Sequence, residues 1–205
     1  MRRKIAAEAR QMQTALGGAI SAWARIEGEL CNLFAFAVCN RNNMMPAIEA
    51  FCSVHSAEVQ IDMTSAAITS ALYKTDELAH WKELKRRVDK LRERRNKLAH
   101  GQIVRVETGD KYSVDFLPFH HFGSAKDMWD HEHWTAKDLT TLANAFKATA
   151  KDIFNFHHAL LGREKPPQLS PAPDLQLGRA PSRVRLGLPS RPRASAQTSA
   201  KPSRQ

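Results

Sequence analysis

The chain has 205 residues, with 31 Lys and Arg against 21 Asp and Glu, and a formal net charge of +10. This length suits one folded core of ordinary size with an appended segment. The sequence contains no run of 18 apolar residues, which excludes the class of proteins built on membrane-spanning helices.

The three cysteines carry no metal-binding pattern. Cys31, Cys39 and Cys52 are spaced by eight and thirteen residues, which matches no zinc site. All three lie in apolar helical context, so we expect reduced core residues. The odd count, together with an N-terminus that lacks the apolar segment of a signal peptide, predicts a cytoplasmic protein. We expect no metal and no cofactor.

Apolar spacing predicts a first helix from about Ala6 to Cys39, with Gly17 and Gly18 as a candidate interruption. Either Ile26 or Glu27 occupies one position on the apolar side of this helix. The other residues expected on that side of its second half are Ile20, Trp23, Leu30, Phe34 and Val38.

Two shorter helices are expected next. Pro46 suits the first turn of a short helix that runs through Phe51. Ser56 is a candidate N-cap for the following helix. We expect one face of that helix, made mostly of small residues, to pack closely against a neighbouring helix. This face consists of Val59, Met63, Ala66, Ala67 and Ser70.

A heavily charged helix is predicted to begin after Thr75, its N-cap, and to carry Asp76 and Glu77 in its first turn. Its apolar stripe contains Leu78, Trp81, Leu84, Val88, Leu91 and Leu98. Arg95 falls in the same stripe. A guanidinium on the inward side of a helix is costly unless an anionic group meets it.

The last turn of this helix carries candidate site residues. Asn96 and His100 are four residues apart, so their side chains are neighbours. Gly101 is predicted to end the helix and to leave His100 among the last carbonyls, where an imidazolium is favoured. Arginine binds phosphate with two hydrogen bonds, and histidine exchanges protons near pH 7. RNA supplies its own 2′-hydroxyl nucleophile, so such a cluster could cleave RNA without a metal.

Period-two alternation then predicts a β-hairpin at about residues 102–117, with its turn at residues 107–110. Thr135 is expected to cap a final helix, with Asp138 completing a variant of the capping box. The apolar face of that helix consists of Leu139, Leu142, Phe146, Ile153, Phe156 and Leu160.

Residues 118–134 are predicted to form a loop rich in His, Phe and Trp. Residues 130–133, Asp-His-Glu-His, offer donor atoms that suit a transition metal. However, no cysteine joins them, and neighbouring loop residues cannot all converge on one ion, so we predict no metal site. A second hypothesis is that His120 or His121 lines the same cleft as His100 and contacts RNA.

Residues 163–205 contain nine of the 31 basic residues, two of the 21 acidic residues and eight of the ten prolines. The excess charge of the chain is therefore concentrated there, outside a folded domain at residues 1–162. Without aromatic residues, this basic Pro/Arg/Ser-rich tail buries too little apolar surface to offset its ordering entropy, and we predict disorder. The tail either holds polyanions weakly or is a solvated appendage without a partner.

The segment Arg95-Asn96-x-x-x-His100 resembles the signature of the HEPN superfamily of small helical proteins, many of which are metal-independent RNases. Upstream, residues 23–30 resemble the first helix of such proteins, where Glu27 matches an acidic residue that faces the motif. The resemblance covers roughly residues 15–162. It implies a mainly α, up-and-down bundle of four to five helices, here with the β-hairpin inserted after the motif helix.

The resemblance also implies an activity. Two copies would pair as a homodimer, and single-stranded or tRNA-like RNA would be cut to 2′,3′-cyclic phosphate ends. Arg95 would bind the scissile phosphate, His100 would act as general acid or base, and Asn96 would orient His100 or the phosphate. Separately, we expect weak RNA contacts from Arg94 and Lys97. The family further suggests a toxin or defence role with a separate neutralising protein.

Two other interpretations remain open. The chain could be a non-catalytic RNA-binding, nucleotide-binding or protein-interaction module that uses Arg95 only to hold an anion. In the purely structural interpretation, Arg95 pairs with Glu93, Glu27 or Asp89, and His100 caps its own helix.

Overall fold

The structure, a computed structural model, describes residues 2–39, 43–73, 75–108, 111–118, 133–162, 169–171 and 175. Within these ranges the protein is mainly α-helical, with a two-stranded antiparallel hairpin after the fourth helix, as predicted. The elements are α1 (Arg2–Cys39), α2 (Met45–Cys52), α3 (Ala57–Ala71), α4 (Asp76–Ala99), β1 (Gly101–Thr108), β2 (Lys111–Pro118) and α5 (Ala136–Gly162).

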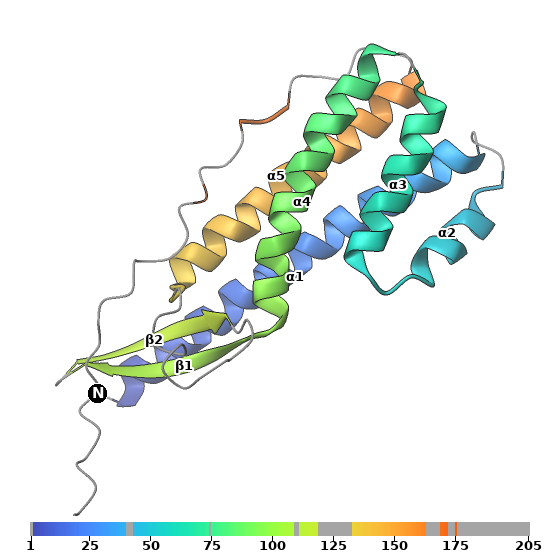
Figure 1. The fold of residues 1–205 in the computed structure, drawn as a ribbon. Helices are drawn as coiled ribbons and strands as arrows, with labels where there is room; N and C mark the ends of the chain where they lie inside the picture. The colour runs from blue at the N-terminus through green and yellow to red at the C-terminus, as the bar shows by residue number, and fades with distance from the viewer. Residues whose placement is uncertain are drawn as a thin grey trace, which may run out of the picture.

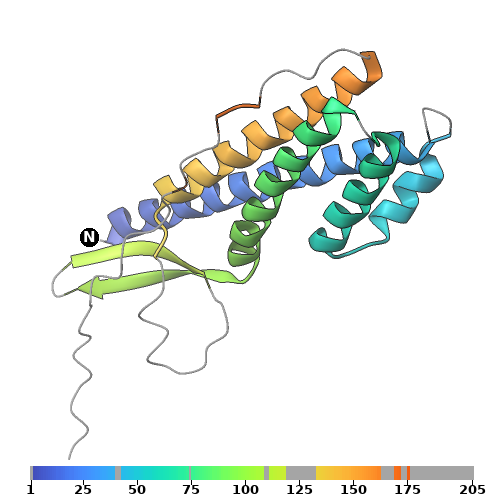
Figure 2. The same ribbon diagram turned by 45° about the horizontal axis from the view of Figure 1, so that its top comes forward.

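Helix α1 is the central element of the fold. It lies beside α5 over much of its length, and the two helices run in the same direction (Figures 1 and 2). Helix α4 crosses them in the opposite direction, α2 and α3 cover one end of α1, and the β-hairpin lies against the other end. The C-terminal turn of α4 therefore meets the middle of α1, which is where the predicted site residues lie.

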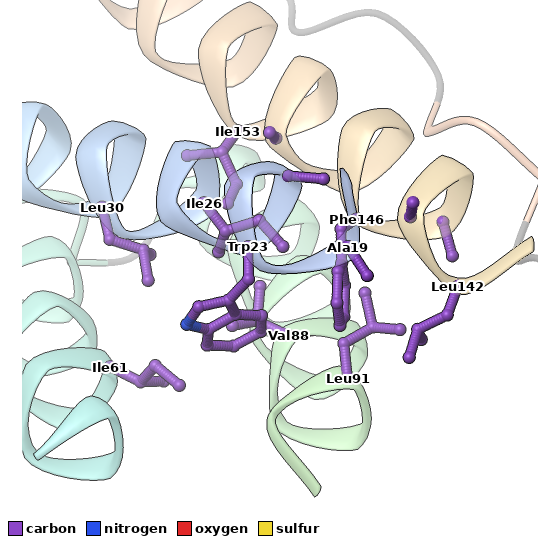
Figure 3. Packing of buried hydrophobic residues seen from close by; sticks show 14 of the residues in the cluster. Ala19, Trp23, Ile26, Leu30, Ile61, Val88, Leu91, Leu142, Phe146 and Ile153 are labelled. Atoms are coloured by element: carbon purple, nitrogen blue, oxygen red, sulfur yellow. The ribbon is translucent and has the colours of Figure 1, made fainter. Parts of the chain in front are cut away.

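The hydrophobic core fills the space between α1, α4 and α5 (Figure 3). Trp23 of α1 packs edge-to-face on Phe146 of α5, with 5.3 Å between ring centroids. Val88 and Leu91 of α4 close the same core from the other side. Each of these four side chains is at most 3% exposed, so their burial supplies much of the free energy that holds the three helices together.

Helix α1 differs from its predicted form in two ways. It continues through Gly17 and Gly18 without interruption. Ile20 and Val38 are 53% and 55% exposed, so placing them on the buried side was wrong. The buried stripe instead runs through Ala19, because a small residue there lets α5 approach closely. With Ala19 on the buried side, the adjacent Ile20 points outward. The buried residues of α1 are Met12, Ala19, Ala22, Trp23, Ile26, Leu30, Cys31, Leu33 and Ala35.

The short helices were placed correctly, but the packing face of α3 was not. Ser56 caps α3, and its side chain accepts a hydrogen bond from the Val59 N–H at 3.4 Å. Val59 itself is 45% exposed. The buried face consists of Ile61, Thr64 and Ile68. The two isoleucines gain free energy from burial, and the Thr64 hydroxyl is satisfied by donating to the Gln60 carbonyl oxygen at 2.9 Å.

The predicted helices α4 and α5 and the two paired strands of the hairpin are confirmed, although Leu78 and Leu160 of the predicted apolar faces are only partly buried. The apolar stripe of α4 is buried from Trp81 to Leu98. The hairpin pairs Ile103 with Phe116 in regular antiparallel register. At the start of α5, the Thr135 N–H donates to Asp138 Oδ2 at 2.8 Å, and the Asp138 N–H donates to Thr135 Oγ1 at 3.3 Å. This is the reciprocal bonding of a capping box.

Gly101 follows α4 as predicted, but for a different reason. His100 is the C-cap of α4, with φ of −112°, and Gly101 is the first residue of β1. A Cβ atom on Gly101 would collide with the Phe116 ring and with the Leu117 carbonyl oxygen. The glycine is therefore required by close packing of the hairpin and not by a left-handed backbone.

Three parts of the sequence predictions fall partly or wholly outside the described residues. These are the hairpin turn at 109–110, the loop residues 119–132 with His120, His121 and His131, and most of the tail. Within the tail, Leu169 and Leu175 pack against the core, and Ser170 is bonded to α5. These three residues lie beyond residue 162, the predicted end of the folded domain. No helix in the described part of the chain has the length and apolar character needed to cross a membrane.

Candidate functional site

Arg95 of α4 and Glu27 of α1 face each other where the two helices cross. Arg95 Nη2 lies 3.8 Å from Glu27 Oε1, and the two side chains are 36% and 32% exposed. This separation is too long for a hydrogen bond, so the pair is held by charge. The same Oε1 atom accepts a hydrogen bond of 2.5 Å from Trp23 Nε1. The buried indole thus fixes the carboxylate, while the guanidinium keeps hydrogen-bonding capacity toward solvent.

The Arg95–Glu27 pair borders a groove of about 530 Å³ between α1, α2 and the start of α3. Its polar lining includes Asn32, His55 and Gln60. The remaining wall is apolar or sulfur-bearing and consists of Gly28, Cys31, Ile48, Phe51, Cys52 and Val54. A groove with an arginine at its edge and both polar and apolar walls suits a ligand that combines an anionic group with a flat or apolar one.

Asn96 and His100 do not line this groove. His100 is exposed at the end of α4, where its backbone N–H donates to the Asn96 carbonyl oxygen at 3.2 Å. The helix is therefore capped by the His100 backbone, and no hydrogen bond or ion pair within the described residues engages the imidazole. One chain thus brings Arg95 to Glu27 but leaves His100 on a neighbouring surface.

Several other cations of α4 are paired with carboxylates. Arg92 pairs with Glu58 at 2.5 Å, and Lys85 lies 3.2 Å from Asp62 and 2.9 Å from Asp89. Carboxylates of α3 thus neutralise the middle of α4. Asp89 is engaged by Lys85, and Glu27 is the ion partner found for Arg95 among the alternatives Glu93, Glu27 and Asp89. Arg94, Arg95 and Lys97 are all half-buried in the last two turns.

Sequence reasoning missed a second arginine in α4. Arg87 is only 7% exposed, and its Nη1 donates to Asp152 Oδ2 of α5 at 2.8 Å. The sequence did indicate that Arg87 is buried, because Arg87 lies three residues after Leu84 and next to Val88 on the buried face of the helix. The sequence prediction considered Arg95 and did not consider Arg87. Arg87 belongs to the core and not to the groove.

Sequence reasoning also missed the groove residues contributed by α2 and its following turn. Cys31 is buried as expected, but Cys39 is half-buried and Cys52 is exposed, so the prediction of three core cysteines was wrong for Cys52. Cys52 ends α2 and has solvent on one side because α2 covers α1 with only one face. The spacing of the cysteines held no signal that Cys31 and Cys52 line the same groove.

No group of three or more His, Cys, Asp or Glu side chains in the described ranges is arranged to hold a metal ion. Of the histidines considered as metal donors, His133 is described, and its Nδ1 lies 3.4 Å from Asp115 Oδ2 of β2. Comparisons with protein-family models, with curated proteins and with solved structures found no match. The resemblance to HEPN proteins therefore rests on the sequence motif alone.

Proposed function

We propose that the protein is a metal-independent endoribonuclease with a HEPN-like, up-and-down helical bundle. The observation that carries the proposal is the placement of Arg95 and His100 at the C-terminal end of α4. There, a half-exposed Arg95 with hydrogen-bonding capacity to spare precedes by five residues an exposed His100, whose imidazole has no partner in the described part of the chain. The position of Glu27 beside Arg95 supports it, since the resemblance expects an acidic residue opposite the motif.

The chemistry follows from the residue types. The RNA 2′-hydroxyl loses its proton and attacks phosphorus, and the 5′-oxygen leaves with a proton, which yields a 2′,3′-cyclic phosphate and a 5′-hydroxyl. Arg95 would stabilise the charge that develops on the phosphorane oxygens. His100 would transfer one of the two protons, and Asn96 would orient the ring or the phosphate.

A second copy of the chain is part of the proposal. Arg95 and His100 lie five residues apart, so the helical repeat directs them to different sides of α4. A homodimer that apposes the ends of two α4 helices would let Arg95 of one copy and His100 of the other act on one phosphate. Arg94, Lys97, His120 and His121 would then contact flanking nucleotides.

Single-turnover cleavage of labelled tRNA and single-stranded RNA in EDTA tests the activity. His100→Ala should lower the rate by at least about 100-fold, as expected for loss of a general acid or base, without a change in the circular dichroism spectrum. His158→Ala is the matched control, because His158 is also exposed but lies near the end of α5. Equal rates for His100→Ala and the parent would overturn the proposal.

A second candidate function is RNA binding without cleavage. It is favoured by one observation, namely that His100 does not share the groove with Arg95. In this case, the parent protein would bind labelled RNA in EDTA, leave it intact, and lose affinity on Arg95→Ala but not on His100→Ala. Growth arrest on expression, relieved by His100→Ala, would instead favour the nuclease and a toxin or defence role with a neutralising partner.

A further inference from the structure

Two cysteine thiols from different helices meet in the wall of the groove. Cys31 lies on α1 and Cys52 is the last residue of α2, and both line the groove. The two side chains belong to one wall of the groove and are close enough to interact electrostatically. Cys31 is 9% exposed, whereas Cys52 is open to solvent. A solvent-accessible thiol beside a buried second thiol is the arrangement of a redox-sensitive pair.

The two thiols have different environments. Burial, together with the adjacent Cys52, raises the pKa of Cys31 to about 11. Cys31 therefore stays protonated at neutral pH. An oxidant reaches Cys52 first, because Cys52 is the exposed member. Cys31 is then in position to resolve the product.

We propose that Cys31 and Cys52 form a reversible disulfide, with a low-molecular-weight disulfide such as glutathione disulfide as the oxidant. The Cys52 thiolate attacks one sulfur of the oxidant and releases one thiolate. Cys31 then gives up its proton to solvent and attacks Cys52 Sγ, which releases the second thiolate. Two protein thiols are oxidised to one disulfide, and one oxidant disulfide is reduced to two thiols.

The disulfide would fasten α2 onto α1 beside the candidate site. Glu27 lies one helical turn before Cys31, and Phe51, the neighbour of Cys52, already packs on Phe34 of α1 with 5.7 Å between ring centroids. The bond would therefore fix a wall of the groove bordered by Arg95. This inference concerns thiol chemistry and does not depend on RNA cleavage, so its tests are independent of the nuclease assay.

Thiol counting on the full chain gives the first test. The protein is equilibrated with glutathione buffers of increasing oxidised fraction, quenched in acid, unfolded, and alkylated with N-ethylmaleimide before mass spectrometry. Two of the three cysteines should become protected together, and peptide mapping should find residues 31 and 52 linked. Full alkylation at every buffer ratio, or a link through Cys39, would overturn the proposal.

Matched variants sharpen the result. Cys39→Ser is the control and should keep the Cys31–Cys52 link, because Cys39 does not line the groove. Cys52→Ser should lose the link, and its exposed position makes misfolding a minor concern. Cys31→Ala should instead accumulate a Cys52–glutathione adduct. If the parent protein accumulated as much of this adduct, Cys31 would not be the residue that resolves it, and the proposal would be wrong.

Thermal unfolding gives a second, independent readout. A disulfide that constrains the unfolded chain between residues 31 and 52 should raise the Tm of oxidised Cys39→Ser by roughly 5–10 °C over its reduced form. Oxidised and reduced Cys52→Ser should unfold at the same temperature. An unchanged Tm on forming the link in Cys39→Ser would contradict the proposed fastening of α2 to α1.

Discussion

The Arg87 guanidinium and the Asp152 carboxylate form an ion pair between α4 and α5 that is almost sealed from solvent. Arg87 Nη1 and Asp152 Oδ2 are 2.8 Å apart, and the side chains are 8% and 3% exposed. Ser170 contributes its backbone N–H and its hydroxyl to the same carboxylate, the latter at 2.7 Å. The Asp152 oxygens are thus well satisfied, whereas the buried Arg87 Nε lacks a partner among the described residues.

Arg87→Met should lower the free energy of unfolding by about 3–5 kcal/mol, because it leaves Asp152 charged and buried without its cation. Urea unfolding followed by circular dichroism measures this loss. The double variant Arg87→Met/Asp152→Leu should recover most of it, since no uncompensated charge then remains in the core.

Arg86 provides the control for this prediction. It is the next residue on α4, and its Nη2 lies 2.6 Å from Glu83, but the pair is exposed. Arg86→Met should therefore leave the urea midpoint almost unchanged. Equal destabilisation by Arg86→Met and Arg87→Met would mean that burial of the Arg87–Asp152 pair is not what makes it important.

Gly101→Ala should destabilise the protein by about 1–3 kcal/mol, the usual cost of overpacking a tight site. The added Cβ would meet the Phe116 ring, which is fully buried and stacked on Trp134, so the ring cannot swing away. Thermal unfolding measures the loss. Phe116→Leu in the same chain should make Gly101→Ala less costly, and additive effects of the two substitutions would argue against a direct clash.

Gly17→Ala is the matched substitution for Gly101→Ala. Gly17 lies exposed in the middle of α1, and nothing lies within 4 Å of its Cβ position. There the alanine should stabilise the protein by about 0.5–1 kcal/mol, because glycine loses more backbone entropy on entering a helix. If the two substitutions change the free energy of unfolding in opposite directions, the effect at Gly101 comes from a steric clash and the effect at Gly17 from helix propensity.

The sequence was most informative where one face of an element is buried. In α4 and α5, apolar residues recur with helical spacing, and the Thr135–Asp138 pair marks a helix start by local bonding alone. Helix α1 was harder, because α5, α3 and α2 cover it from several directions and no single stripe describes its buried surface. The exposure of Ile20 and Val38 could not be deduced from a pattern that assumes one buried face.

The same distinction holds for the candidate site. Arg95 was identified because it interrupts an apolar stripe, and Glu27 because of a resemblance in the first helix. The groove itself depends on α2 folding back onto α1, a contact between residues far apart in the chain. Neither the meeting of Cys31 with Cys52 nor the bond from Ser170 to Asp152 leaves a local signal, since each needs the tertiary structure to bring the partners together.

Stability should decrease as the pH falls below about 6.5, the ordinary pKa of histidine. Burial, with a further contribution from Arg87, lowers the pKa of His80, although Asp152 opposes the shift. The folded state thus favours the neutral ring, which stacks on Phe156 with 5.4 Å between centroids. Below the unfolded pKa, the unfolded chain takes up a proton that the folded chain does not, so stability is lost until the folded pKa is passed.

Urea midpoints at pH 7.5 and 5.5 measure this dependence. His80→Phe keeps a ring on Phe156 but removes the titrating group, so its midpoint should change less between the two pH values. Some dependence should remain from His157, whose pKa is lowered by burial and by His158. The same change in midpoint for His80→Phe and the parent would exclude His80 as a source of acid sensitivity.

Glu27→Gln should strengthen the binding of polyanions at Arg95. The amide keeps an oxygen that can accept the Trp23 Nε1–H bond but removes the negative charge 3.8 Å from Arg95 Nη2. Because the pair is half-exposed, the gain is limited to about 1 kcal/mol, or roughly fivefold in affinity for single-stranded RNA. Fluorescence anisotropy in EDTA, with His100→Ala present in every protein to prevent cleavage, measures the affinity across a series of salt concentrations.

A double-variant cycle identifies the origin of that gain. If Glu27 acts by neutralising Arg95, Glu27→Gln should have little effect in an Arg95→Ala background. An Arg95 released to contact one phosphate should also steepen the salt dependence, by up to about 0.7 in the slope of log affinity against log salt for single strands. Equal tightening with and without Arg95 would show that Glu27 repels RNA directly. Arg95 would then no longer be the phosphate-binding group of this site.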